Sequence, residues 1–134
     1  VKAQVQDKDL RRIRIYDFLS QKDMAYAVSD VVISRAGALA ISELCLTKRP
    51  CILVPSPNVA EDHQTKNALT LVQAEAARMI KDAEAKTKLI DESLKLIYDE
   101  QQCEALRQNI AKLGKPKATE EIVNEIEKLI KQEL

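Results

Sequence analysis

One stretch of the chain combines a tight turn, small side chains and a carboxylate in a pattern that suits a phosphorylated sugar ligand. It runs from Ser34 to Glu43, between an apolar β-branched stretch and a helix-forming stretch. Free N–H groups of the first helical turn, around Ala38 and Leu39, together with the helix dipole predict an anion site suited to a diphosphate. The small residues here, Gly37 among them, let a ligand approach the backbone closely.

Glu43 follows this turn inside the predicted helix. It lies three residues after Ala40 and seven after Ala36, so it shares their face one turn further along. A carboxylate in that position can accept two hydrogen bonds from vicinal hydroxyls, such as those of a ribose. The alternative is an ordinary strand–glycine–helix turn followed by a solvated glutamate.

A second polar group follows the next apolar stretch of the chain. Two prolines stiffen the loop after it, and His63, Gln64 and Asn67 then fall within the first turns of a predicted helix. Uncharged hydrogen-bonding side chains of this kind suit sugar hydroxyls better than phosphates. The alternative for His63 is a surface or capping histidine.

A third group contains Phe18 and Leu19, which follow a short alternating stretch. The two side chains can flank a planar base while the backbone reads its polar edge; the alternative is that both pack in the core. No Ser/His/Asp or Cys/His nucleophile arrangement is visible, and with one histidine a multi-histidine metal site is excluded. We therefore expect no metal and no cofactor.

The elements that position these groups follow from hydrophobic patterning. Short strands are predicted over 13–16, 31–33, 51–54 and 77–80, and helices within 17–29 and over 38–47, 62–75, 83–98, 101–113 and 119–134. This order predicts an α/β fold with a parallel sheet and right-handed crossovers, with ligands bound beyond the carboxyl ends of the strands. We expect a single partial domain, with an α/β part over 1–82 and C-terminal helices over 83–134.

Composition excludes several classes of protein. The chain has 134 residues, of which 46% are hydrophobic and 31% charged, which is typical of a globular domain. Lys and Arg number 21 and Asp and Glu number 21, so the usual electrostatic case for a nucleic-acid partner is missing. No apolar run approaches the roughly 20 residues of a membrane-spanning helix, and the beginning carries no signal-peptide pattern.

The rare residue types are also informative. Three cysteines at unrelated spacings read as reduced, cytoplasmic thiols, with Cys45 and Cys51 as small buried apolar residues. The chain has two glycines, so we expect each to mark a turn that other residues cannot make. Gly114 precedes Lys115-Pro116 and reads as a helix stop. The abrupt start before Ile13 is typical of a fragment of a longer chain.

Several motifs taken together resemble one family. They are Asp30-Val31-Val32-Ile33-Ser34-Arg35-Ala36-Gly37-Ala38 with Ser42-Glu43, then Val54-Pro55-Ser56-Pro57 and Gln64-Thr65-Lys66-Asn67-Ala68, with Phe18-Leu19 upstream. This combination resembles the MurG family, the UDP-N-acetylglucosamine (UDP-GlcNAc) transferases that complete lipid II in peptidoglycan synthesis. The resemblance covers nearly the whole chain, but only the larger part of the family's C-terminal, donor-binding domain.

The resemblance implies a Rossmann-like sheet with flanking helices, the C-terminal half of a GT-B fold, ending in three consecutive helices. It implies an inverting, metal-independent transferase that passes GlcNAc from UDP-GlcNAc to undecaprenyl-diphospho-MurNAc-pentapeptide, turning lipid I into lipid II. The N-terminal acceptor domain, with the family's presumed general base and membrane-docking patch, is absent. We therefore expect no catalytic residue in this chain, no activity from it alone, and contact with the cytoplasmic face of the bacterial inner membrane only through the intact enzyme.

Carried over by resemblance, the nucleotide half of the site lies on two segments. Ala38 and Leu39, beside Gly37, would donate backbone N–H groups to the diphosphate, and Glu43 would hold the ribose hydroxyls. Leu19, with Phe18 next to it, would meet the uracil through its backbone.

The sugar half shows departures from the family. His63 and Gln64, with Asn67 one turn later, stand where the family's Gln-Gln pair contacts the GlcNAc hydroxyls, and His63 replaces the first glutamine. Ala40 stands where the family often has threonine, and Lys22 stands where it usually has methionine. The glycine-rich loop that opens the family's C-terminal domain is missing.

Three other functions remain open from the sequence. An epimerase acting on UDP-GlcNAc would need carboxylates and a histidine for proton transfer at the sugar, which the chain does not show. A separate donor subunit of a split GlcNAc transferase, as in the eukaryotic dolichol-linked enzyme, would act only with a partner; the abrupt start favours an excised fragment. A helical interaction module built on the last three helices predicts no nucleotide binding.

Overall fold

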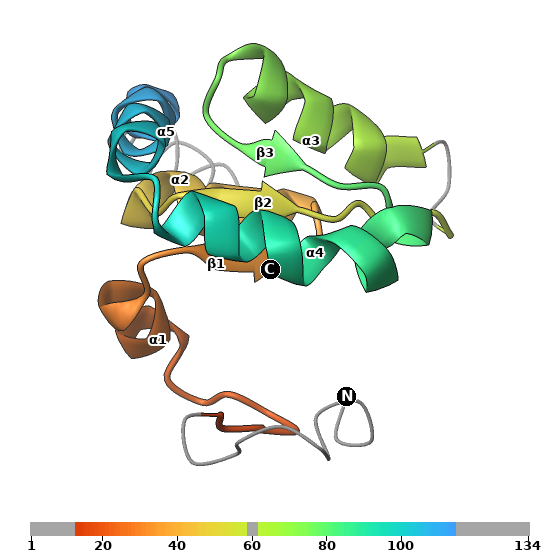
Figure 1. Ribbon diagram of the computed structural model, residues 1–134, viewed down its shortest axis with the longest axis horizontal. Coiled ribbons are helices and arrows are strands. Elements are labelled where there is room, and N and C mark those ends of the chain that lie inside the picture. Colours follow the sequence, from red (N-terminus) through yellow and green to blue (C-terminus); the bar gives the residue numbers. More distant parts are fainter. Residues whose placement is uncertain (1–12, 59–61, 115–134) are drawn as a thin grey trace, which may run out of the picture.

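The computed structural model describes residues 13–58 and 62–114, and the predicted helix over 119–134 lies outside them. Helices and strands alternate along the chain before two helices end the described part (Figure 1). The elements in order are α1 (Lys22–Val28), β1 (Val32–Ser34), α2 (Ala38–Thr47), β2 (Cys51–Leu53), α3 (His63–Gln73), β3 (Arg78–Met79), α4 (Asp82–Ile97) and α5 (Glu100–Leu113).

The three strands form one parallel sheet in the order β1-β2-β3. Val32 pairs with Cys51 and Leu53 pairs with Met79, so the carboxyl ends of the strands meet at one edge. All three arrows point to the same side in Figure 1. The predicted fold class, a parallel sheet with flanking helices, is confirmed.

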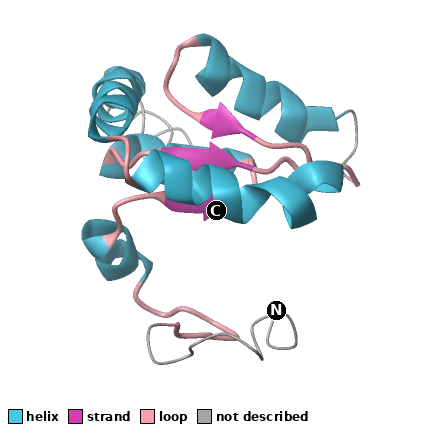
Figure 2. Cartoon of the chain, in the orientation of Figure 1, coloured by secondary structure: helices cyan, strands magenta, loops and turns pink. Residues whose placement is uncertain are grey.

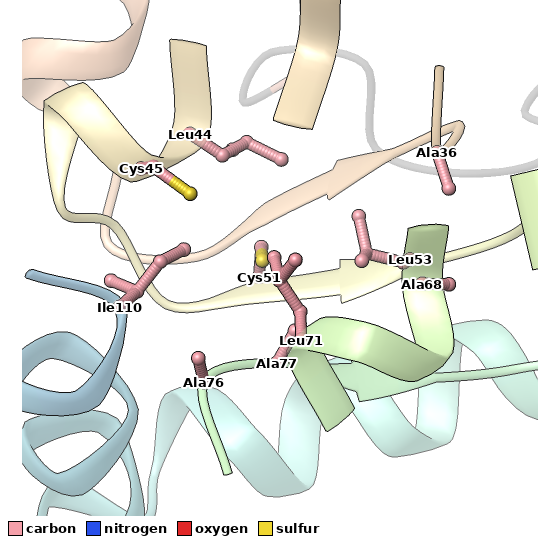
Figure 3. Packing of buried hydrophobic residues seen from close by; sticks show 10 residues of the cluster. All are labelled: Ala36, Leu44, Cys45, Cys51, Leu53, Ala68, Leu71, Ala76, Ala77 and Ile110. Atoms are coloured by element: carbon pink, nitrogen blue, oxygen red, sulfur yellow. The ribbon is translucent and has the colours of Figure 1, made fainter. Parts of the chain in front are cut away.

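The central strand β2 is buried on both faces, and its successive side chains point to opposite faces of the sheet. Cys51 and Leu53 pack on one face against α2, α3 and α5, where Leu44 and Ile110 are fully buried (Figure 3). Ile52 packs on the other face in a second cluster with Leu96, Leu106, Cys103 and Ile80. Burial on both faces explains why β2 reads as a continuous apolar run rather than an alternating one.

The strand predicted over 13–16 does not form, and that prediction is wrong. Residues 13–21 are loop (Figure 2), and Ile13, Ile15 and Tyr16 are 39%, 36% and 61% exposed. Alternation of apolar and polar residues predicts a face but supplies no hydrogen-bonding partner, and a strand needs a neighbouring strand to be stable. No described strand lies beside this segment.

The three cysteines, Cys45, Cys51 and Cys103, are buried, as expected of small apolar residues. Burial, with Cys45 close by, raises the pKa of the Cys51 thiol to about 12, so this thiol keeps its proton at neutral pH. Within residues 13–58 and 62–114, no helix combines the length and apolar character that a membrane span needs. The same residues bring no three His, Cys, Asp or Glu side chains together as metal ligands.

The expectation that each glycine marks a turn that other residues cannot make is wrong for Gly37, and for Gly114 it holds for a different reason, which is a close approach of another backbone segment. Gly37 has φ −68° and Gly114 has φ −76°, values that any residue adopts. What differs is the space around them. A Cβ on Gly114 would lie 2.5 Å from the carbonyl oxygen of Cys45, whereas a Cβ on Gly37 would meet only the Gln64 amide nitrogen, at 3.8 Å. Gly114 thus lets α5 end against the backbone of α2.

This difference predicts opposite outcomes for the same substitution. We expect Gly114→Ala to destabilise the chain by about 1–3 kcal/mol, because a backbone carbonyl cannot move aside as a flexible side chain can. We expect Gly37→Ala to change stability by less than about 1 kcal/mol, because the lost helix-capping preference is offset by a less flexible unfolded chain. Urea unfolding of the two variants tests this. Equal losses of unfolding free energy in the two variants would show that the contact between position 114 and Cys45 does not affect stability.

Candidate functional site

The turn from β1 into α2 presents an open helix N-terminus at the carboxyl edge of the sheet. Gly37 is the N-cap and offers no side chain, and the first backbone hydrogen bond of α2 runs from the N–H of Ile41 to the carbonyl of Gly37, at 3.0 Å. The N–H groups before Ile41 therefore have no acceptor within the helix. The first turn of α2 holds no acidic residue, and Leu39 is 71% exposed. This arrangement suits an anion that reaches the turn from solvent.

Two amide side chains of α3 hold this turn in place. Gln64 Oε1 accepts the backbone N–H of Ala36 at 3.2 Å and that of Ser56 at 2.8 Å. One helical turn later, Asn67 Nδ2 donates to the carbonyl of Ala36 at 3.0 Å. The loops after β1 and β2 are thus joined through α3, and Ala36 between them is fully buried.

The amide nitrogen of Gln64 points towards the turn. This atom, Nε2, lies 3.8 Å from the position that a Cβ on Gly37 would take. Because Oε1 already accepts two backbone N–H groups, the amide nitrogen is the part of Gln64 that can donate to a ligand. The sequence predicted a sugar contact for Gln64 and did not predict its role as a link between loops.

Arg35 also holds the carboxyl edge of the sheet together. Its guanidinium donates to Asp82 Oδ1 at 2.6 Å, and also to the carbonyls of Val54 at 3.2 Å and Pro55 at 3.5 Å. Arg35 therefore connects the ends of β1 and β2 to the start of α4. Its side chain is half-exposed, so its contribution is chiefly to the geometry of the edge.

Glu43 is not simply a solvated glutamate. It is partly buried on α2, and its Oε2 accepts a hydrogen bond of 3.0 Å from the hydroxyl of Tyr26 on α1. Burial, followed by this hydrogen bond to the carboxylate, raises the pKa of Tyr26 to about 12. The phenol therefore stays protonated at neutral pH and donates steadily to Glu43.

The two residues predicted to meet a base lie in the loop before α1 and differ in their surroundings. Leu19 lines a cavity of about 230 Å³ together with Tyr26, Ile33 and Ser34 at the end of β1. Phe18 is 82% exposed and does not line that cavity. The alternative that both pack in the core is therefore wrong.

His63 is the first residue of α3 and is exposed. A larger cleft of about 490 Å³ opens beyond the ends of β2 and β3, lined by Pro55, Met79 and Lys81 among others. None of the nine predicted site residues lines it. The structure thus brings Gly37, Gln64 and Asn67 together, and leaves Phe18 apart.

Sequence reasoning missed two contacts at the candidate site, those of Tyr26 with Glu43 and of Arg35 with Asp82. Tyr26 meets Glu43 across 17 residues and Arg35 meets Asp82 across 47. Neither separation leaves a periodic signal in the chain. The one usable signal was that Arg35 stands inside the motif itself, next to Ala36.

A parallel α/β sheet with an uncapped helix N-terminus at its carboxyl edge is an architecture found in many α/β domains that bind ligands at that edge. The glycosyltransferase family 28 C-terminal domain matches residues 1–128 of the chain. The chain therefore belongs to this family, and the resemblance to MurG noted from the sequence is confirmed.

Two similar proteins carry the same name. The chain is 50% identical over 118 residues to a "UDP-N-acetylglucosamine--N-acetylmuramyl-(pentapeptide) pyrophosphoryl-undecaprenol N-acetylglucosamine transferase" of Cytophaga hutchinsonii, covering 88% of this chain and 32% of that protein. It is 50% identical over 125 residues to a protein of the same name from Bacteroides thetaiotaomicron, covering 93% of this chain and 34% of that protein. The chain thus spans about a third of the length of these curated relatives.

A solved structure supports the same relationship. The crystal structure of Acinetobacter baumannii MurG matches with a TM-score of 0.74 at 26% identity. The match covers 86% of this chain and 33% of that chain.

Proposed function

We propose that this chain is the donor-binding part of an inverting, metal-independent transferase that moves GlcNAc from UDP-GlcNAc to undecaprenyl-diphospho-MurNAc-pentapeptide. Two relatives, each 50% identical, are named as transferases of this kind. The location that we propose with this activity is the cytoplasmic face of the bacterial inner membrane. The acceptor-binding site and the general base that we propose lie in parts of the transferase outside this chain.

The observation that carries the proposal is the open N-terminus of α2 on the same helix as Glu43. The uncapped N–H groups of Ala38 and Leu39 bind the diphosphate, and Gly37 leaves the approach clear. As the bond to the sugar breaks, negative charge grows on the departing diphosphate. Fixed N–H groups and the helix dipole stabilise that charge without having to reorient.

The nucleoside extends from this turn towards α1. The ribose hydroxyls donate hydrogen bonds to the carboxylate oxygen of Glu43 that Tyr26 leaves available. The base enters the cavity of about 230 Å³ beside Leu19, a size that suits a single ring rather than a drug-sized ligand. Phe18, being exposed, borders the base from outside.

The sugar lies on the side of α3. His63 and the Nε2 amide of Gln64 contact its hydroxyls, and Asn67 supports them by holding the carbonyl of Ala36. A site built to hydrogen-bond a hydroxyl discriminates strongly, because the wrong epimer leaves a buried polar group unpaired.

Calorimetry on the 134-residue chain tests this proposal. We expect saturable binding of UDP and UDP-GlcNAc in the presence of EDTA, because N–H groups rather than a metal neutralise the diphosphate. We expect no transfer of GlcNAc to a lipid-linked acceptor by the chain alone.

Three outcomes would contradict parts of this proposal. Absence of nucleotide binding would favour a helical interaction module. A requirement for Mg²⁺ would refute the assignment of the diphosphate to α2. Transfer by the chain alone would show that it holds its own general base.

A further inference from the structure

Tyr26 occupies a position between the predicted base and ribose subsites. Its ring packs against the buried cluster that includes Cys51, and it also lines the cavity shared by Leu19 and Ser34. Its hydroxyl lies at the edge of these apolar residues and donates to Glu43 Oε2 at 3.0 Å. One side chain therefore touches both the cavity proposed for the base and the carboxylate proposed for the ribose.

The backbone that carries Tyr26 is fixed at the end of α1. The N–H of Ser29 donates to the carbonyl of Tyr26 at 3.2 Å. The guanidinium of Arg49, which precedes β2, donates to the carbonyl of Ala27 at 3.0 Å and to that of Ser29 at 3.3 Å. α1 is thus tied to the strand that forms the centre of the sheet, and the phenol has a defined position.

The contact also leaves half of the carboxylate for another partner. Within the described part of the chain, Tyr26 is the residue that donates a hydrogen bond to the side chain of Glu43, and it donates to one oxygen. A carboxylate has about four lone-pair positions on two oxygens. The second oxygen remains available to vicinal hydroxyls.

We propose that Tyr26 is a positioning residue for nucleotide binding, which holds the carboxylate of Glu43 in the orientation that receives the ribose hydroxyls. This inference rests on the proposed function and extends it to a residue on a different helix. A glutamate that is free to rotate loses rotamer freedom when it binds a ligand. Tyr26 removes that freedom before the ligand arrives, so the loss does not weaken binding.

The test compares two nucleotides in the full-length transferase that contains this chain. UDP carries both ribose hydroxyls, and 2′,3′-dideoxy-UDP carries neither, so the ratio of their Kd values isolates the ribose contact. The variants are Tyr26→Phe, Glu43→Ala and the double variant. Phenylalanine keeps the ring against the core and removes only the hydroxyl. Tyr98→Phe is the matched control, because Tyr98 is 83% exposed at the end of α4.

We expect Tyr26→Phe to raise the Kd of UDP about fivefold, the cost of ordering one side chain that is no longer held in place, and to leave the Kd of dideoxy-UDP unchanged. In the Glu43→Ala background the same change should have no further effect on UDP, because the group that it positions is gone. Tyr98→Phe should leave both Kd values unchanged.

The other outcomes separate failure of this inference from failure of the proposed function. Equal weakening of UDP and dideoxy-UDP by Tyr26→Phe, no weakening at all, or a full effect in the Glu43→Ala background would overturn the positioning role and leave the ribose contact of Glu43 intact. If Glu43→Ala itself binds UDP and dideoxy-UDP in the native ratio, Glu43 does not contact the ribose, and both the proposed contact and the inference are refuted.

Discussion

Replacing Glu43 with alanine in the full-length transferase is expected to lower kcat/KM for UDP-GlcNAc by about tenfold or more, because hydrogen bonds to a charged group contribute about 1.5–3 kcal/mol. The proposed ligand loses its acceptor for two ribose hydroxyls at once. We expect only a small change in Tm, because the donor that loses its acceptor is the hydroxyl of Tyr26, which is only partly buried. Steady-state kinetics with thermal unfolding of the same samples measures both effects.

Two further variants make this result specific. Glu43→Gln keeps an oxygen for Tyr26 and should lose less activity than alanine. Glu104→Ala removes an exposed glutamate of α5 that pairs only with neighbouring residues on its own helix, and should leave kcat/KM unchanged. If Glu43→Ala mainly lowers Tm and the remaining folded protein is fully active, Glu43 is a structural residue.

Gln64→Ala should have the second large effect, on stability and binding together. It leaves the N–H groups of Ala36 and Ser56 without their acceptor, which costs about 1–3 kcal/mol for a buried donor. Because those N–H groups hold the turn that receives the diphosphate, we expect UDP to bind more weakly as well. The affinity for UDP-GlcNAc should fall more than the affinity for UDP, because UDP-GlcNAc also loses its contact with Gln64 Nε2.

The contribution of each end of the Gln64 amide can be separated. Gln64→Glu retains an acceptor for both N–H groups but has no donor, so we expect its Tm to stay close to that of the parent. Thr70→Ala is the matched control on α3, because its hydroxyl bonds only within the helix. Unchanged UDP inhibition and unchanged Tm in Gln64→Ala would show that the link between the loops is unimportant and that Gln64 contacts only the sugar.

Local features of the chain were sufficient for most elements. The predicted helix over 38–47 has the same bounds as α2, and the predicted strand over 51–54 differs from β2 by one residue. These elements follow from neighbouring residues: a continuous apolar run bounded by prolines predicts a buried strand, and a glycine before a run of helix formers predicts a helix start. The edge that we propose as the ligand site followed from the order of elements, because parallel strands end together.

Local features also led to errors where a partner was required. The alternation over 13–16 predicts a strand, but no described strand lies alongside to pair with it, and the segment is loop. The two glycines were read as conformational signals, whereas Gly114 is needed because the carbonyl of Cys45 comes close. In both cases the deciding atom belongs to a distant part of the chain.

By itself, then, the sequence determined the family, the order of most helices and strands, and the turn that we propose as the ligand site. Only the tertiary structure decided which side chains meet there. Tyr26 reaches Glu43 across 17 residues, and Asn67 reaches Ala36 across 31. Propensities and periodicities act over a few residues, whereas these contacts depend on how each crossover returns the chain to the sheet, and that is a property of the whole fold.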